Sequence, residues 1–133
     1  MREILFRGKV KDNGEWVYGN LSQRDNIKKW EYFIGQNSLG YEVIPETVGQ
    51  YTGLTDKNGT KIFEGDILER RHKELRNHSQ RMKVQFIPVK ACFAAVDIDG
   101  GNVTFISDYI NNKYELEVIG DVHDNPELLE ATE

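Results

Sequence analysis

The sequence predicts an all-β (mainly β) fold. Glycine occurs twelve times against three prolines, and the apolar residues form short clusters instead of repeating at helical spacing. Asn-Gly and other Gly-containing segments separate these clusters at close intervals, as turns do in β-barrels and sandwiches. At 133 residues the chain suits one domain, or one domain with a small appendage, and is long enough to bury a core.

The first third of the chain predicts two β-hairpins. Four runs have the strand pattern: residues 4–10, 16–21, 30–35 and 41–44. Asn13-Gly14 readily adopts the positive φ values of a tight turn between the first two runs. Pro45 ends the second pair, because proline has no amide to donate to a neighbouring strand. We therefore expect residues 1–46 to form an N-terminal β-hairpin region.

The remaining residues, 47–133, predict a small β-barrel with a short C-terminal helix. The strand candidates are residues 67–70, 82–86, 91–98, 102–106 and 114–120. Asp99-Gly100-Gly101 supplies a tight turn, residues 107–112 form one helical turn, and residues 125–130 form a capped short helix that starts with proline. The long polar stretch 71–81 predicts a mobile loop between two strands or a short exposed helix.

Residues 51–68 read YTGLTDKNGTKIFEGDIL and contain two turn signals, D-K-N-G and E-G-D. Six residues are expected to have backbone roles in these turns, by accepting amides or by taking a positive φ: Gly53, Asp56, Asn58, Gly59, Gly65 and Asp66. Glu64 and Asp66 could form a carboxylate pair on one strand face, but acceptance of backbone amides in a turn explains them better. An apolar strand after E-G-D is also how, by analogy, many small SH3-like barrels enter a barrel strand.

The net charge of −5 is unevenly distributed along the chain. Residues 97–133 hold ten acidic groups and one basic group, whereas residues 69–83 hold six basic residues against two glutamates. The six basic residues are Arg70, Arg71, Lys73, Arg76, Arg81 and Lys83. The acidic total opposes a general nucleic-acid coat protein, but a local basic stretch can still attract a polyanion. The basic segment of one copy could equally pair with the acidic tail of another.

Two classes of function stay open on this pattern. In the first, the chain is a non-enzymatic, homo-oligomeric protein-interaction module, because the Trp and Tyr side chains of the hairpin region need a surface to pack on. In the second, it is a nucleic-acid-binding small β-barrel that uses the basic 70–83 segment together with aromatic residues. Candidate aromatic residues are Trp16, Tyr18, Trp30 and Tyr32. We prefer the first class, since the overall acidity opposes the counterion release that drives the second.

The sequence contains no G-x-G-x-x-G, P-loop or C-x-x-C motif, so we expect no enzymatic activity and no cofactor. Asp56-x-Asn58 begins like a calcium loop, but Lys61 and Ile67 stand where an EF-hand needs Gly and Glu. A third class, a metal-assisted hydrolase, could use the polar segment 121–124, which contains Asp121, His123 and Asp124. A polar turn before the last helix explains that segment more simply.

The chain is expected to be cytoplasmic and not to enter a membrane. It begins Met1-Arg2-Glu3-Ile4, without the apolar region of a signal peptide. Its apolar runs are all much shorter than the roughly 20 residues that a membrane-spanning helix needs. The single cysteine, Cys92, has apolar neighbours and predicts a buried thiol in a reducing compartment.

Residues 51–68 are also similar to the central signature of the YopX-like proteins of bacterial phages and prophages. Three further segments agree with this family in the same order: FRGKVKDNGEWVYGNL (6–21), PETVGQ (45–50) and EVIGDVHDNPELL (117–129). The resemblance implies a mainly β fold, with an N-terminal hairpin region and a C-terminal small barrel of SH3-like type. It also implies a phage or prophage origin in a Gram-positive bacterium, where host or phage proteins are partners to expect. It implies no activity and no catalytic residue.

Overall fold

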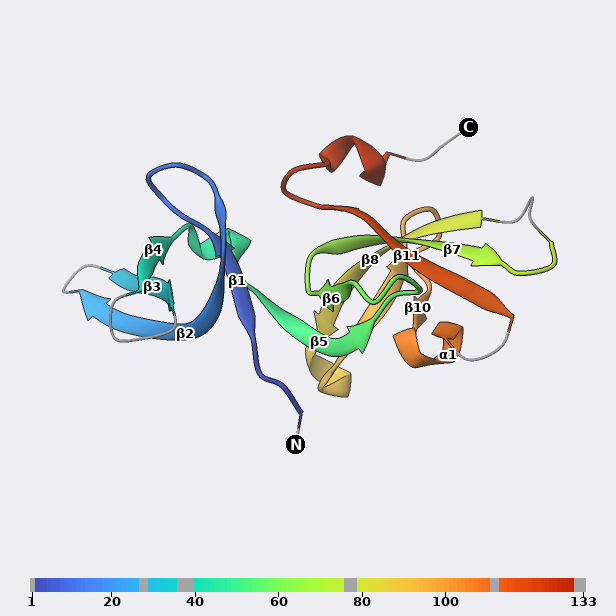
Figure 1. Ribbon diagram of the computed structural model, residues 1–133, viewed down its shortest axis with the longest axis horizontal. Coiled ribbons are helices and arrows are strands. Elements are labelled where there is room, and N and C mark those ends of the chain that lie inside the picture. The colour runs from blue at the N-terminus through green and yellow to red at the C-terminus, as the bar shows by residue number, and fades with distance from the viewer. Residues whose placement is uncertain (1, 27–28, 36–39, 76–78, 111–112, 131–133) are drawn as a thin grey trace. The chain divides into compact units, whose positions relative to one another are not determined.

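The computed structural model describes the chain in five stretches, residues 2–26, 29–35, 40–75, 79–110 and 113–130. It is mainly β, as predicted, and forms two compact units, Met1–Gly53 and Leu54–Glu133 (Figure 1). The boundary predicted between residues 46 and 47 lies earlier in the chain than the boundary between these two units, and it falls inside the short 3-10 helix η1 (Pro45–Thr47). The two units are described separately.

The N-terminal unit is an antiparallel sheet in the order β4-β3-β2-β1-β5. Its strands are β1 (Phe6–Lys9), β2 (Trp16–Asn26), β3 (Lys29–Gly35), β4 (Tyr41–Val43) and β5 (Gly49–Thr55), the last of which runs on into the second unit. Both predicted hairpins are confirmed, since β1 pairs with β2 and β3 pairs with β4. Strand β2 extends beyond its predicted end, because its second half pairs with β3 while its first half pairs with β1.

The N-terminal sheet curls so that the chain after β1 also reaches β4. Val10 forms a bridge with Val43, and the amide of Ile44 donates to the carbonyl of Lys9. Val10, Ile34 and Val43 are buried and form the centre of the unit. Gly8 permits this packing, since a Cβ at that position would lie 3.1 Å from both the Ile34 Cδ1 and the Val43 Cβ. The N-terminal region therefore has a small apolar centre of its own.

The C-terminal unit contains an antiparallel sheet in the order β10-β9-β8-β7-β11. Its elements are β6 (Lys61–Phe63), β7 (Asp66–His72), β8 (Ser79–Ile87), η2 (Pro88–Lys90), β9 (Cys92–Asp97), β10 (Val103–Thr104), α1 (Ile106–Ile110), β11 (Tyr114–Asp121) and η3 (Pro126–Leu129). The predicted pairing of the strands on either side of Asp99-Gly100-Gly101 is confirmed, with Gly101 at φ 69°. In the described residues β10 and β11 are the two edges of an open sheet, so the SH3-like barrel stays a prediction.

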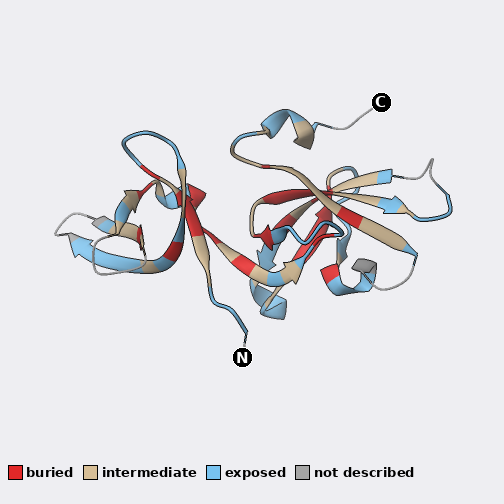
Figure 2. Ribbon diagram, viewed as in Figure 1, coloured by how far each residue is buried: buried red, intermediate tan, exposed pale blue. Residues whose placement is uncertain are grey.

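The core of the C-terminal unit lies on one side of this sheet. Its buried members are Ile62, Leu68, Met82, Val84, Ala95, Ile106 and Leu116. Buried positions, red in Figure 2, alternate along the middle of β8 at Met82 and Val84. In β7 three successive residues, Asp66, Ile67 and Leu68, are buried, so both faces of that strand are covered at its start. Cys92, predicted to be buried, is only half-buried because it lies at the first position of β9.

The loop predicted at residues 71–81 is shorter than expected in the part that the structure describes, because residues 71–72 and 79–81 belong to strands and only residues 73–75 lie outside them. Strand β7 continues to His72 and β8 starts at Ser79, and their pairs include Glu69 with Arg81 and Arg70 with Gln80. The Arg70 side chain also donates to the Gln80 Oε1 at 2.9 Å. Cross-strand polar pairs of this kind stabilise a strand without the apolar alternation by which strands are recognised.

The C-terminal helix is present as the 3-10 helix η3, which starts with Pro126 as predicted. The predicted cap is wrong, because the Asn125 side chain makes no capping hydrogen bond. Its Oδ1 instead accepts the amide of Asp121 at 3.2 Å. In the described part of the chain, the helices are all too short to cross a membrane.

Candidate functional site

The predicted basic segment does not form one positive face. Side chains alternate across a sheet, so Arg70 lies on the side of Leu68 and the core, whereas Arg71 lies on the opposite side. The register with β8 places Arg81 and Lys83 on that opposite side as well. Of the remaining candidates, Lys73 follows β7 and is exposed, and Arg76 lies outside the described residues. The two faces therefore have to be considered separately.

On the side opposite the core, the basic residues alternate with acidic ones. Glu69 stands across from Arg81 and forms an ion pair with Arg71, and Glu115 stands across from Arg71 on β11. Arg71 and Arg81 thus each have a carboxylate as a neighbour, whereas Lys83 stands across from Ile67 and Val96. Such a face attracts a polyanion only weakly.

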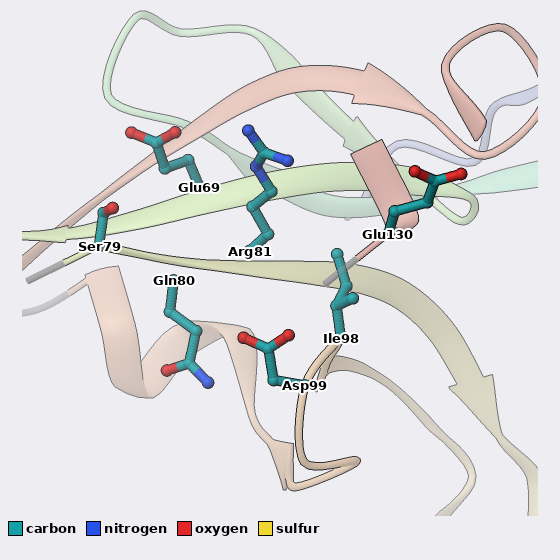
Figure 3. Close-up of a pocket in the computed structure, with 7 residues that line it drawn as sticks. All are labelled: Glu69, Ser79, Gln80, Arg81, Ile98, Asp99 and Glu130. Atoms are coloured by element: carbon teal, nitrogen blue, oxygen red, sulfur yellow. The ribbon is translucent and has the colours of Figure 1, made fainter. Parts of the chain in front are cut away.

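A small hollow of about 160 Å³ opens on this mixed-charge face (Figure 3). Arg81 lies among three carboxylates that line the hollow, those of Glu69, Asp99 and Glu130. The apolar wall comes from Ile98. The carboxylates outnumber the guanidinium, so this hollow disfavours a phosphate or another anion.

The second hollow is larger, about 310 Å³, and lies where the turn after β5 meets the edge of β11. Its lining includes Thr55, Lys57, Lys73, Tyr114, Glu115 and Leu116. Tyr114 is surrounded by basic groups that sequence reasoning did not connect with it. The Arg70 Cζ lies 4.6 Å from the centre of its ring, and the His72 ring meets it edge-on at 5.2 Å. The antiparallel pairing of β7 with β11 brings these residues together across more than forty positions of sequence.

Asp56 fixes the turn beside this hollow. Its Oδ1 accepts the amides of Asn58 at 2.8 Å and Thr60 at 2.9 Å, and its Oδ2 accepts the amide of Val118 at 2.9 Å. The amide of Lys57 also donates to the carbonyl of Leu116 at 3.0 Å. A buried carboxylate with three charge-assisted hydrogen bonds is well satisfied, so the turn is held firmly on β11.

The other residues of the 51–68 stretch also have backbone roles. Gly53, Gly59 and Gly65 have φ values of 90°, 80° and 93°, a region that favours glycine. Asp66 is buried and accepts the amide of Phe63 at 2.7 Å, which engages its carboxylate in the E-G-D turn. This geometry supports a structural turn and gives no support to a catalytic pair of Glu64 with Asp66.

The segment at Asp121, His123 and Asp124 also forms a turn. The Asp121 Oδ1 accepts the amides of His123 at 2.9 Å and Asp124 at 2.8 Å, which orients it toward the backbone. Among the residues that the structure describes, no three His, Cys, Asp or Glu side chains gather as metal ligands would. The geometry therefore does not support the metal-assisted hydrolase.

The aromatic candidates belong to the N-terminal unit, and they differ in exposure. The Trp16 ring lies beneath two cations, with the Arg7 Cζ at 4.6 Å and the Lys9 Nζ at 5.5 Å from its centre. Three other aromatic residues are strongly exposed: Tyr18 (48%), Trp30 (53%) and Tyr41 (62%). We call these three the exposed aromatic set.

Comparison with solved structures finds chains that share the fold, among them one from Bacillus subtilis and one from Enterococcus faecalis. Protein yopX from Bacillus subtilis aligns over 100% of both chains with a TM-score of 0.61 and 19% identity. Protein EF1440 from Enterococcus faecalis aligns over 98% of this chain and 100% of its own, with a TM-score of 0.59 and 23% identity. At these identities the likeness shows the fold alone.

Comparison with curated proteins finds no match. The profile of the family described as YopX protein matches residues 5–130, nearly the whole chain. The four segments that suggested this family are therefore part of one continuous match. The chain belongs to the YopX protein family.

Proposed function

We propose that this chain is a phage accessory protein that works in the cytoplasm of a bacterial host as a homo-oligomeric protein-interaction module. On this proposal it has no enzymatic activity of its own. The exposed aromatic set carries the proposal, because Tyr18, Trp30 and Tyr41 lie on three different strands of the N-terminal sheet and stay about half exposed or more. Tyr and Trp are enriched at protein interfaces, where they contribute large contact areas.

The size of these side chains supports an interface. The strand register places Trp30 and Tyr41 on the same side of the sheet and Tyr18 on the other. A Tyr or Trp side chain presents roughly 150–250 Å² when fully exposed, so Trp30 and Tyr41 together leave on the order of 200 Å² accessible. Exposed Tyr and Trp side chains that share a side of a sheet are a common feature of interaction sites. Strand β4 is already contacted by the chain after β1, so side-chain packing explains the interaction better than addition of a strand at that edge.

A second copy of the chain is the partner that the charges favour. The basic residues concentrate in 69–83 and the acidic residues in 97–133, so two copies can place opposite charges together. A two-fold arrangement would also bury Trp30 and Tyr41 of both copies at one interface.

Light scattering after size-exclusion chromatography tests this proposal. We expect the wild-type chain to have a mass above that of one chain at micromolar concentration. The double substitution Trp30→Ser and Tyr41→Ser should shift it to the monomer, because it removes most of the apolar contact. Val89→Ser is the matched control, since Val89 is 92% exposed but lies in the C-terminal unit. A wild-type protein that is strictly monomeric would contradict the proposal, and so would a double variant of unchanged mass.

A further inference from the structure

The larger hollow beside Tyr114 combines an ordered wall, cationic groups and an aromatic ring. It lies entirely within the C-terminal unit and is separate from the exposed aromatic set. Its volume of about 310 Å³ falls at the lower end of the range of small-molecule sites. The smaller hollow at Arg81 does not share this chemistry, because carboxylates dominate its lining.

The wall of the hollow is fixed before any ligand arrives. Asp56 is only 8% exposed, and its three hydrogen bonds hold the turn against β11. The amide of Lys57 is bonded to Leu116, so the backbone that carries the Lys57 side chain is anchored at the mouth. A site that is already ordered loses little entropy when it binds.

Two ammonium groups at the hollow are available to an anion. Lys73 is exposed, and within the described part of the chain its ammonium makes no ion pair. The Lys57 Nζ lies 3.7 Å from Glu115 and 3.5 Å from Glu117, longer than the 2.7–2.9 Å typical of a strong charged hydrogen bond. Because these pairs are also solvent-exposed, Lys57 can exchange them for a phosphate at low cost.

The aromatic wall suits a flat ring. The Arg70 guanidinium lies over the Tyr114 ring and the His72 ring meets it edge-on, and Arg70 is itself fixed by its hydrogen bond to Gln80, so the ring is held in place. Leu116 also lines the hollow but is only 2% exposed, so the apolar surface open to a ligand comes mainly from Tyr114. An aromatic ring with cations close by is the combination by which proteins bind nucleotides of single strands without reading sequence.

We infer that this hollow binds a phosphorylated nucleotide, with the base against Tyr114 and the phosphate at Lys57 and Lys73. The hydroxyl of Thr55 is a further donor to the phosphate. Glu115 is the one lining carboxylate not committed to backbone amides, and it opposes the phosphate and competes for Lys57. The nucleotide can be free or part of a single strand, since both present the same base and phosphate.

Fluorescence anisotropy with a short labelled thymidine oligonucleotide tests this site. Wild type should bind in about 50 mM salt and lose affinity as salt rises. Lys73→Ala should weaken binding about tenfold, the value of one charged hydrogen bond. It should also reduce, by about 0.7, the steepness with which the logarithm of the binding constant falls with the logarithm of the salt concentration. Lys90 is an exposed cation of the same unit that does not line the hollow. Lys90→Ala should therefore change neither the affinity nor the salt dependence.

Two further variants distinguish this site from a general attraction to charge. Glu115→Gln should tighten binding, because it removes a repelling carboxylate and leaves Glu117 as the one remaining partner of Lys57 in these pairs. Tyr114→Leu should weaken binding about tenfold with an unchanged salt slope, provided that its circular dichroism spectrum matches wild type. Competition with unlabelled thymidine monophosphate separates the two sources of the nucleotide. If it displaces the labelled oligonucleotide at millimolar concentration, the site takes a free nucleotide, and if it does not, the site needs a single strand. The inference would be overturned if the wild type did not bind in low salt. It would also be overturned if Lys73→Ala and Lys90→Ala lost equal affinity, or if Glu115→Gln bound more weakly than wild type.

Discussion

Two turns of the C-terminal unit begin with the same local pattern but use it differently. Asp56-Lys57-Asn58-Gly59 and Asp97-Ile98-Asp99-Gly100 both have an Asp at the first position and a Gly at the fourth. Asp56 and Asp97 are equally buried, each 8% exposed. The Asp56 carboxylate accepts three amides, whereas the Asp97 Oδ1 is buried with no hydrogen-bond partner in the part of the chain that the structure describes.

The difference comes from what lies opposite each turn. The first turn faces the edge of β11, where the amide of Val118 needs an acceptor. The second turn closes a hairpin whose backbone groups satisfy one another, since the amide of Asp97 donates to Asn102 and the amide of Gly101 donates to Asp97. Its cross-strand neighbour on β8 is the buried, apolar Met82. A turn pattern therefore specifies the path of the chain, and the neighbouring strand decides the role of the side chain.

Asp56→Ala should have the largest effect on stability. The substitution leaves three amides without their acceptor. One of them belongs to Val118 on β11, which lies 62 positions later in the sequence. We expect a loss of about 3–5 kcal/mol in the free energy of unfolding, measured by urea denaturation followed by circular dichroism. A loss below about 1 kcal/mol would show that water replaces the carboxylate, and that the two aspartates are alike.

The fourth position of each pattern should separate the turns by a smaller amount. Gly59 has a φ of 80° and open space around its Cβ position, so Gly59→Ala should cost about 1–2 kcal/mol from backbone strain alone. Gly100 is not among the glycines with a positive φ, and a Cβ there would make an ordinary contact of 3.6 Å with the Asn102 Nδ2. Gly100→Ala should therefore leave the urea midpoint almost unchanged. Equal losses in the two variants would remove this distinction.

Asp97→Asn should have the smallest effect, and in the opposite direction. It removes a charge from a buried position where one carboxylate oxygen has no donor. We expect the free energy of unfolding to stay the same or rise by up to about 1 kcal/mol in the same urea experiment. A destabilisation above about 2 kcal/mol would show that the carboxylate has a stabilising partner and would contradict the contrast with Asp56.

Local signals in the sequence predicted the local features of the fold. Asn13-Gly14 and Asp99-Gly100-Gly101 predicted hairpins that the structure contains, because a tight turn needs only its own residues to be recognised. The 51–68 stretch likewise indicated the family, which the match over residues 5–130 confirms. The fold class and the strand-rich halves of the chain follow from signals of this kind.

Features that depend on register could not be predicted from the sequence. The segment 69–83 contains a run of charges, but pairing with β8 and β11 sends Arg70 and Arg71 to opposite sides of the sheet. The approach of Arg70 to Tyr114 has no local signal, because only the β7–β11 pairing creates it. Asn125 shows the same limit on a small scale, since its side chain binds the amide of Asp121 and leaves the helix uncapped.

The bond between Asp56 and Val118 also bears on the order in which the chain can fold during synthesis. The two residues are 62 positions apart, and β11 is the last strand of the described chain. Until β11 leaves the ribosome, β7 has a neighbour on one side only and the Asp56 turn lacks the strand that it binds. Contacts of such long range are slow to form, so we expect the C-terminal unit to complete its fold only after translation of residue 118. Its strand edges would stay accessible to chaperones until then.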